Sequence, residues 1–191
     1  MNLPRLRLRN GGFSLVEFLA VILVSGIALT GVYSIFISQQ KAFSGQERVA
    51  EMNQNIRAVM DLMTREIRLA GYRTPGAAFN GIATAQPSTI RILADLNQDG
   101  DTVDNNEDII YSYNAGTLQI WRNGSTFPVA ENITNLTLTY RDANNNITAV
   151  LANIRKVTIS ITARSAYLDP NTGQYRTLTL TSDVTPRNLA S

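Results

Sequence analysis

The apolar positions of the chain follow one pattern before residue 40 and different patterns after it. From Phe13 to Ile37 the sequence is almost entirely apolar, and Glu17 is its only charged residue. A helix of about 20 apolar residues crosses the hydrocarbon core of a membrane, whereas a cleaved secretory signal has a core of only about 7–15 residues. The segment also continues into a Gln-Gln-Lys stretch (39–41) rather than into a small-residue cleavage site. We therefore predict a membrane-spanning helix.

Beyond Ile37 the apolar residues recur at steps of three and four, which is the spacing of one face of a helix. No proline occurs from residue 5 to residue 74, and Gly71 followed by Pro75-Gly76 supplies a stop signal. We predict one helix from Phe13 to about Ala70, with its first half in the membrane and its second half packed on a sheet. The apolar stripe of the second half consists of Val49, Met52, Ile56, Val59, Met60, Met63 and Ile67.

After Pro75 the helical spacing gives way to apolar residues that alternate with threonine and serine, as in half-exposed antiparallel strands. About six strands are expected, and turn-forming stretches lie at 114–116, 142–146 and 169–173. One long helix followed by these strands predicts an α+β fold, with the helix packed on one face of an antiparallel β-sheet. The alternating sets are Ile90/Ile92, Ile109/Tyr111/Tyr113, Leu118/Ile120, Leu136/Leu138/Tyr140, Val157/Ile159/Ile161 and Leu178/Leu180.

The composition excludes several classes of function. The chain has no cysteine and no histidine, which rules out a disulfide framework, a thiolate zinc site, a thiol nucleophile and a Ser-His-Asp arrangement. Its 17 basic and 15 acidic residues form no broad basic face, so nucleic acid is not an expected partner. We expect a protein that is not an enzyme.

The arginines before the apolar segment predict its orientation in the membrane, and the acid within it, Glu17, needs an explanation. Three arginines lie within residues 5–9, so the N-terminus is expected in the cytoplasm and everything after residue 40 on the far side. An ordinary signal anchor does not account for Glu17, because an unpaired acid inside a membrane is unfavourable by roughly 3 kcal/mol. A cut between Gly12 and Phe13 would create an α-amino group one helical turn from Glu17. That group could pair with Glu17 of the same chain or of a neighbouring one.

A short basic leader, a glycine pair ending at Gly12, the stretch Phe13-Ser14-Leu15-Val16-Glu17 and a long apolar run together resemble the signal of type IV prepilins and pseudopilins. The resemblance implies that a membrane prepilin peptidase cleaves after Gly12 and N-methylates Phe13. It also implies that Glu17 guides docking of the subunit into a growing filament.

The same resemblance implies partners, a location and a division of the chain. The partners are the prepilin peptidase, other minor and major pilins, the assembly platform of the inner membrane, and membrane lipid before assembly. The protein would be a single-pass protein of the bacterial inner membrane with a periplasmic C-terminal domain, and would then reach the pilus or cell surface. The parts are a leader to be removed (1–12), a transmembrane and filament-core helix (13–40), the amphipathic half of that helix (41–72) and a β-rich periplasmic or extracellular domain (73–191).

Two further stretches resemble one group within this class. Asn55–Met60 leading to Arg65–Tyr72, together with the close at Pro186–Asn188, is similar to PilW-type minor pilins and to the minor pseudopilins of type II secretion. The first interpretation is a PilW-like minor pilin that is incorporated into a type IV pilus or initiates one. A GspJ-like minor pseudopilin of a type II secretion system is an alternative. A calcium-dependent adhesion or binding module on a membrane anchor is another.

An acidic stretch, Asp95–Asp108, lies between two predicted strands. Oxygen-bearing residues at alternate positions, with glycine in the sixth place, match the start of an EF-hand calcium loop. The twelfth place holds asparagine and no helices flank the stretch, so it is either a freestanding Ca²⁺ loop or a solvated turn rich in Asp, Asn and Gly. Repulsion among the carboxylates favours the metal. The candidate ligands are the side chains of Asp95, Asn97, Asp99 and Asp104, the backbone carbonyl of Asp101, and Glu107 or Asp108 as the closing ligand.

Overall fold

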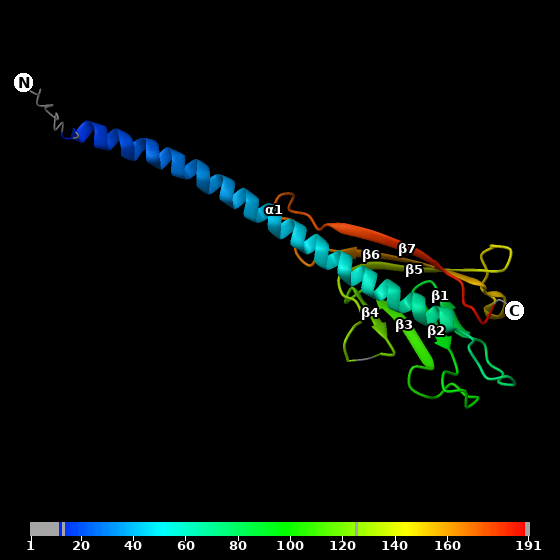
Figure 1. Cartoon of the computed structure of the whole chain (residues 1–191). Coiled ribbons are helices and arrows are strands. Elements are labelled where there is room, and N and C mark those ends of the chain that lie inside the picture. Colours follow the sequence, from blue (N-terminus) through cyan, green and yellow to red (C-terminus); the bar gives the residue numbers. More distant parts are fainter. Residues whose placement is uncertain (1–11, 13, 125, 190–191) are drawn as a thin grey trace, which may run out of the picture. The chain divides into compact units, whose positions relative to one another are not determined.

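A computed structural model describes residues 12, 14–124 and 126–189. The chain forms two compact units, Met1–Ser44 and Gly45–Ser191. Helix α1 (Leu15–Leu69) contributes its N-terminal part to the first unit, and its C-terminal part belongs to the second together with the strands (Figure 1). This long helix agrees with the one predicted from the sequence, although the predicted start, Phe13, lies outside the described residues.

The helix ends close to the predicted stop signal. Gly71 has a φ of +79°, in the left-handed region that favours glycine after the last helical turn. The backbone N–H of Tyr72 donates to the carbonyl oxygen of Leu69 at 2.9 Å, and that of Gly71 donates to the carbonyl oxygen of Leu93 at 2.9 Å. The C-terminal end of α1 is therefore bonded directly to the end of a strand.

Within the described residues, the strands form two antiparallel sheets, one of four strands and one of three. The first sheet has the order β1 (Ile82–Gln86), β2 (Thr89–Leu93), β3 (Asp108–Asn114), β4 (Gln119–Arg122). The second has the order β5 (Ile133–Arg141), β6 (Lys156–Arg164), β7 (Thr177–Val184). In β6 buried residues alternate strictly with half-buried ones, which confirms the predicted alternation.

The predicted α+β class, with a long helix packed against antiparallel strands, is confirmed, but the described residues form seven strands in two sheets instead of about six strands in one. Strand β1 is missed because its sequence, Ile-Ala-Thr-Ala-Gln, has only one large apolar side chain, Ile82, and its pairing is irregular between Ile82 and Thr84. The division into two sheets is missed because alternation shows which side chains share a face but not which strands pair. The turn at 142–146 also leads first to a short 3₁₀ helix, Leu151–Asn153, and only then to β6.

One hydrophobic core joins the second half of α1 to both sheets, and it includes residues from each of the seven strands described. Figure 1 shows this part of the helix lying over strands of both sheets. The predicted stripe faces the core, as expected. Val49 is half-buried, and the residues that are only 0–6 % exposed are Met52, Ile56, Val59, Met60, Met63 and Ile67.

A charged group on α1 lies at the junction with the first sheet. The Glu66 carboxylate accepts hydrogen bonds from the Arg122 guanidinium, with Nη2 at 2.9 Å and Nε at 3.1 Å from Oε1, and from the hydroxyl of Tyr111. The side chains of Glu66 and Arg122 are 15 % and 21 % exposed. Burial, and then the hydrogen bond to Glu66, raise the pKa of the Tyr111 hydroxyl. The network therefore connects the helix to β3 and β4 through groups that have little access to water.

Glu66→Ala is expected to destabilise the second unit by about 2–3 kcal/mol, because it leaves a mostly buried guanidinium and a buried hydroxyl without their shared acceptor. The measurement is urea unfolding of the full chain in detergent, followed by the fluorescence of Trp121, the only tryptophan of the chain. Glu51→Ala is the matched control, because Glu51 lies on the same helix but is exposed. Equal unfolding midpoints for the two variants would contradict the assigned role.

Candidate functional site

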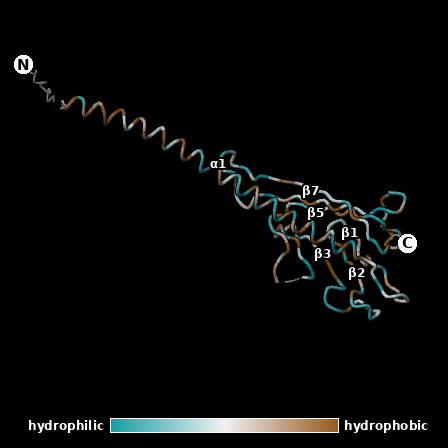
Figure 2. Tube along the Cα trace, in the orientation of Figure 1, coloured by the Kyte–Doolittle hydropathy of each residue, from teal (hydrophilic) through white to brown (hydrophobic). Residues whose placement is uncertain are grey.

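The N-terminal part of α1 presents a continuous apolar surface. An 18-residue window of this helix has a mean hydropathy of 2.3, and none of the window is buried within the structure (Figure 2). The exposed large apolar residues from Leu15 to Phe36 have exposed fractions of 53–78 %. The length and composition of this surface suffice for a helix that crosses a membrane.

Glu17 lies in the first turn of this helix and forms a reciprocal cap with Ser14. The backbone N–H of Ser14 donates to Oε2 of Glu17 at 2.9 Å, and the backbone N–H of Glu17 donates to Oγ of Ser14 at 3.2 Å. This is a capping box, in which two backbone donors that have no partner within the helix are satisfied by side chains. The negative charge also lies at the positive end of the helix dipole. Glu17 thus has a structural role within its own chain.

Sequence reasoning overlooks Ser14, although its signal is present. Serine followed by glutamate three residues later, directly before an apolar run, is the pattern of a capping box. The cap explains how the helix begins at this point. Glu17 can therefore have two roles, as a cap of the helix and as a charged group. The substitution Glu17→Gln separates them, because glutamine can also cap a helix but carries no charge.

Two hydroxyl groups further along the apolar segment are satisfied within the helix. Oγ1 of Thr30 donates to the carbonyl oxygen of Gly26, and Oγ of Ser34 donates to that of Thr30, both at 2.9 Å. Such bonds to the preceding turn allow hydroxyl side chains to enter an apolar environment without an outside partner. Glu17 remains the one charged side chain of this surface.

The predicted processing site lies at the edge of the described chain. Gly12 is described and exposed. Phe13, the predicted site of N-methylation, and the leader residues 1–11 lie outside the described residues. Cleavage between Gly12 and Phe13 therefore stays a prediction.

The acidic stretch forms the connection between β2 and β3, as the sequence predicts. Its two ends are joined by a backbone hydrogen bond from Ala94 to Glu107 at 2.9 Å. Oε1 of Glu107 accepts from the backbone N–H groups of Leu96 and Asn97 at 2.7 and 3.1 Å, so Glu107 holds the start of the loop against its end. The loop is also tied to the end of α1, because the N–H of Asp95 donates to the carbonyl oxygen of Tyr72 at 2.8 Å.

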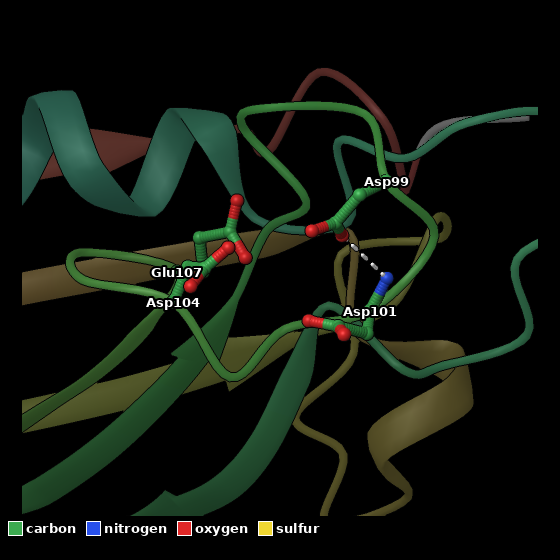
Figure 3. Close-up of side chains that lie close together, drawn as sticks. All are labelled: Asp99, Asp101, Asp104 and Glu107. Atoms are coloured by element: carbon green, nitrogen blue, oxygen red, sulfur yellow. Dashed lines mark hydrogen bonds between the residues drawn. The ribbon is translucent and has the colours of Figure 1, made fainter.

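Successive turns within the loop place alternate side chains on one side. The side-chain oxygens of Asn97, Asp99 and Asp101 each accept a hydrogen bond from the backbone N–H two residues later, at 3.0–3.1 Å. Such turns are typical of Asn and Asp. They bring together the carboxylates of Asp99, Asp101, Asp104 and Glu107, each of which offers an oxygen within 4.8 Å of the others (Figure 3).

The remaining candidate ligands have other partners. Asp108 forms an ion pair with Arg91, in which Nε and Nη2 donate to the two carboxylate oxygens at 2.8 and 2.5 Å. The amide nitrogen of Asn97 donates to carboxylate oxygens of Asp99 and Asp104 at 2.9 and 2.7 Å. For Asp101 the structure places the side chain in the group, whereas the sequence interpretation used its backbone carbonyl.

Asp95, the first candidate ligand of the loop, is fully buried and is not part of the group of four. Its Oδ2 accepts from the backbone N–H groups of Thr74 and Gly100, both at 3.2 Å. Burial acts to raise the pKa of the Asp95 carboxyl, but these donors outweigh it and hold the pKa below its usual value. Asp95 therefore anchors the loop at Gly100, whose φ of +97° suits glycine.

The group of four carboxylates carries mutual repulsion. Desolvation, followed by the negative charges of Asp99, Glu107 and Asp101, raises the pKa of the Asp104 carboxyl. Glu107 is only 2 % exposed, and its Oε2 is buried without a hydrogen-bond partner in the described part of the chain. The oxygens of these four carboxylates are the groups of the loop that could hold a cation.

Comparison with protein families gives two matches. The family model of prepilin peptidase-dependent protein B matches residues 46–184, which is well over half of the chain. The model of the prokaryotic N-terminal methylation motif matches residues 7–33, around the predicted processing site. Comparisons with curated proteins and with solved structures found no match.

Proposed function

The chain belongs to the prepilin peptidase-dependent protein B family, and on this premise we propose that it is a PilW-type minor pilin of a type IV pilus. The family membership and the methylation motif make it a pilin-like protein. We propose that its role is structural and not catalytic. The finer proposal is that the peptidase removes residues 1–12, that Phe13 becomes the methylated N-terminus, and that the subunit enters a filament through α1.

The observation that carries this proposal is the exposed apolar surface of the N-terminal part of α1, most of which lies within the residues that match the methylation motif. Surface of this size and composition is unfavourable in water and needs a membrane or other apolar helices around it. A pilin-like subunit finds both in turn, first lipid and then neighbouring subunits. The arginines before the segment support a cytoplasmic N-terminus and a periplasmic second unit.

The capping geometry supports a docking role for Glu17 after processing. Both cap bonds use groups of Ser14 and Glu17 themselves, and a cut between Gly12 and Phe13 leaves these groups in place. The cap therefore survives the removal of the leader. It uses Oε2 of Glu17 as an acceptor, and Oε1 has no hydrogen bond in the described residues. We propose that this second oxygen and the charge of the carboxylate meet the N-terminal amine of a neighbouring subunit.

Mass spectrometry of the protein recovered from sheared pili tests the proposal. We expect an N-terminal peptide that begins at Phe13 and carries one methyl group, because the peptidase would perform both steps. Protein from cells that lack the peptidase is the control, and it should retain residues 1–12 and remain in the membrane fraction.

Two results would overturn the proposal. An intact leader in protein from pili would exclude processing at Gly12. Recovery of the processed chain only in an envelope fraction that depends on type II secretion, and not in pili, would make the protein a GspJ-like minor pseudopilin instead.

A further inference from the structure

We propose that the loop between β2 and β3 binds one Ca²⁺ ion through the carboxylates of Asp99, Asp101, Asp104 and Glu107. The inference goes beyond the proposed role in the filament and does not depend on it, because it rests on residues of the second unit alone. Figure 3 shows these four side chains directed toward a common space enclosed by the loop.

The buried side chain of Glu107 is a second observation that points to a ligand, in addition to the grouping of the four carboxylates. Its side chain is almost fully buried, and Oε1 is already used to hold the backbone of Leu96 and Asn97. Its Oε2 is also buried but lacks a partner in the described residues. A buried carboxylate oxygen without a partner is strongly unfavourable, and nearly all such atoms in folded proteins have one. A cation held between Glu107 and the other three carboxylates supplies that partner.

The charge around the loop leads to the same conclusion. In the described part of the chain, the acidic partners in ion pairs are Asp108, Glu66, Asp183 and Asp169, so none of the four loop carboxylates is paired with a lysine or arginine. The amide of Asn97 is a neutral donor and bridges only two of them. A divalent cation bound among the four carboxylates would offset part of this negative charge.

The donor set favours calcium over other metal ions. All the offered atoms are carboxylate oxygens, and Ca²⁺ binds six to eight oxygens at about 2.3–2.6 Å. Two oxygens bound to one such ion lie at most about 5 Å apart, which agrees with the 4.8 Å within which the four offered oxygens lie. Mg²⁺ requires shorter distances of about 2.0–2.1 Å and a near-ideal octahedron. Water and backbone carbonyls would complete the shell of the larger ion.

The test uses the full chain in detergent, stripped of metal with a chelator and titrated with Ca²⁺ by calorimetry. We expect one site per chain with a Kd of about 10⁻⁵–10⁻³ M, as in open calcium loops, and weaker binding of Mg²⁺ under the same conditions. Added Ca²⁺ should also raise the unfolding temperature of the chain, because an ion that binds the folded state stabilises it.

Glu107→Gln and Asp101→Asn are the test variants, and each should weaken Ca²⁺ binding at least about tenfold. Glu107→Gln keeps an acceptor for Leu96 and Asn97, and Asp101 is exposed, so at least one variant should fold. Asp142→Asn is the matched control, because Asp142 forms a similar turn in another loop, where its Oδ1 accepts from the N–H groups of Asn144 and Asn146. Its affinity for Ca²⁺ should equal that of the unmodified chain.

Three outcomes would overturn the inference. The first is an absence of both heat and a stability change at millimolar Ca²⁺. The second is unchanged affinity in folded Glu107→Gln and Asp101→Asn, which would indicate diffuse binding to surface acids or detergent. The third is tighter binding of Mg²⁺ than of Ca²⁺.

Discussion

Glu17→Gln is expected to leave removal of the leader intact and to lower the amount of the subunit in pili at least about a hundredfold. Glutamine preserves the size of the side chain and the acceptor that caps the helix, but it removes the charge. In the assembled filament, the partner amine would then lie among apolar helices without a counter-charge. Breaking a buried pair in this way is unfavourable by about 3 kcal/mol or more, which corresponds to at least a hundredfold in an equilibrium constant. Quantitative immunoblotting of sheared pili, normalised to the processed protein in the membrane, measures the effect.

Ser14→Ala is the control that separates docking from capping. It removes the hydroxyl that accepts the N–H of Glu17 but leaves the carboxylate and its charge in place. Loss of such a cap weakens a helix by about 1 kcal/mol, and the surrounding membrane and subunits favour the helical state in any case. We therefore expect Ser14→Ala to be incorporated at nearly the normal level. Equal losses in Ser14→Ala and Glu17→Gln, or normal incorporation of Glu17→Gln, would contradict the docking role.

The long helix, its apolar stripe and most strands could be predicted because side-chain periodicity is a local property. The six deeply buried stripe residues all face the core, and the alternation in β6 persists over the whole strand. Strand β1 and the division into two sheets depend on which segments pair, and pairing is decided by contacts between distant residues. Tyr113 illustrates this, since its hydroxyl donates to the carbonyl oxygen of Ile133 and connects one sheet to the other at 3.1 Å.

In the acidic loop, too, the sequence predicts local features but not the contacts between distant residues. The alternation of Asn and Asp predicts that Asp99 and Asp101 lie on one side of the loop, because each residue forms the same kind of turn. The sequence does not distinguish Glu107 from Asp108 as the closing residue. The pairing of β2 with β3 makes this distinction, because it places Asp108 opposite Leu93 and within reach of Arg91.

Gly81→Ala is expected to destabilise the second unit by about 4 kcal/mol or more, which is the largest effect on stability that we expect from a single methyl group. A Cβ atom at this position would lie 2.2 Å from the backbone nitrogen and 2.4 Å from the Cα atom of Gly71, and 2.7 Å from the carbonyl carbon of Ala70. These atoms are backbone and cannot move aside as a flexible side chain can. The same junction contains hydrogen bonds from Gly71 N–H to Leu93 and from Leu93 N–H to Gly81, both at 2.9 Å.

A shift of this backbone would separate the end of α1 from β1 and β2, and the acidic loop begins just after β2. Gly81→Ala should therefore lower the urea midpoint seen by Trp121 fluorescence, and it should also weaken the binding of Ca²⁺ if the loop binds the ion. Gly45→Ala is the control and should raise the urea midpoint instead of lowering it. A Cβ atom at Gly45 would have only Oδ2 of Asp169 nearby, at 3.8 Å. Alanine is also favoured over glycine in a helix by up to about 1 kcal/mol. A midpoint for Gly81→Ala equal to or above that of the unmodified chain would show that the junction is not as tightly packed as these distances indicate.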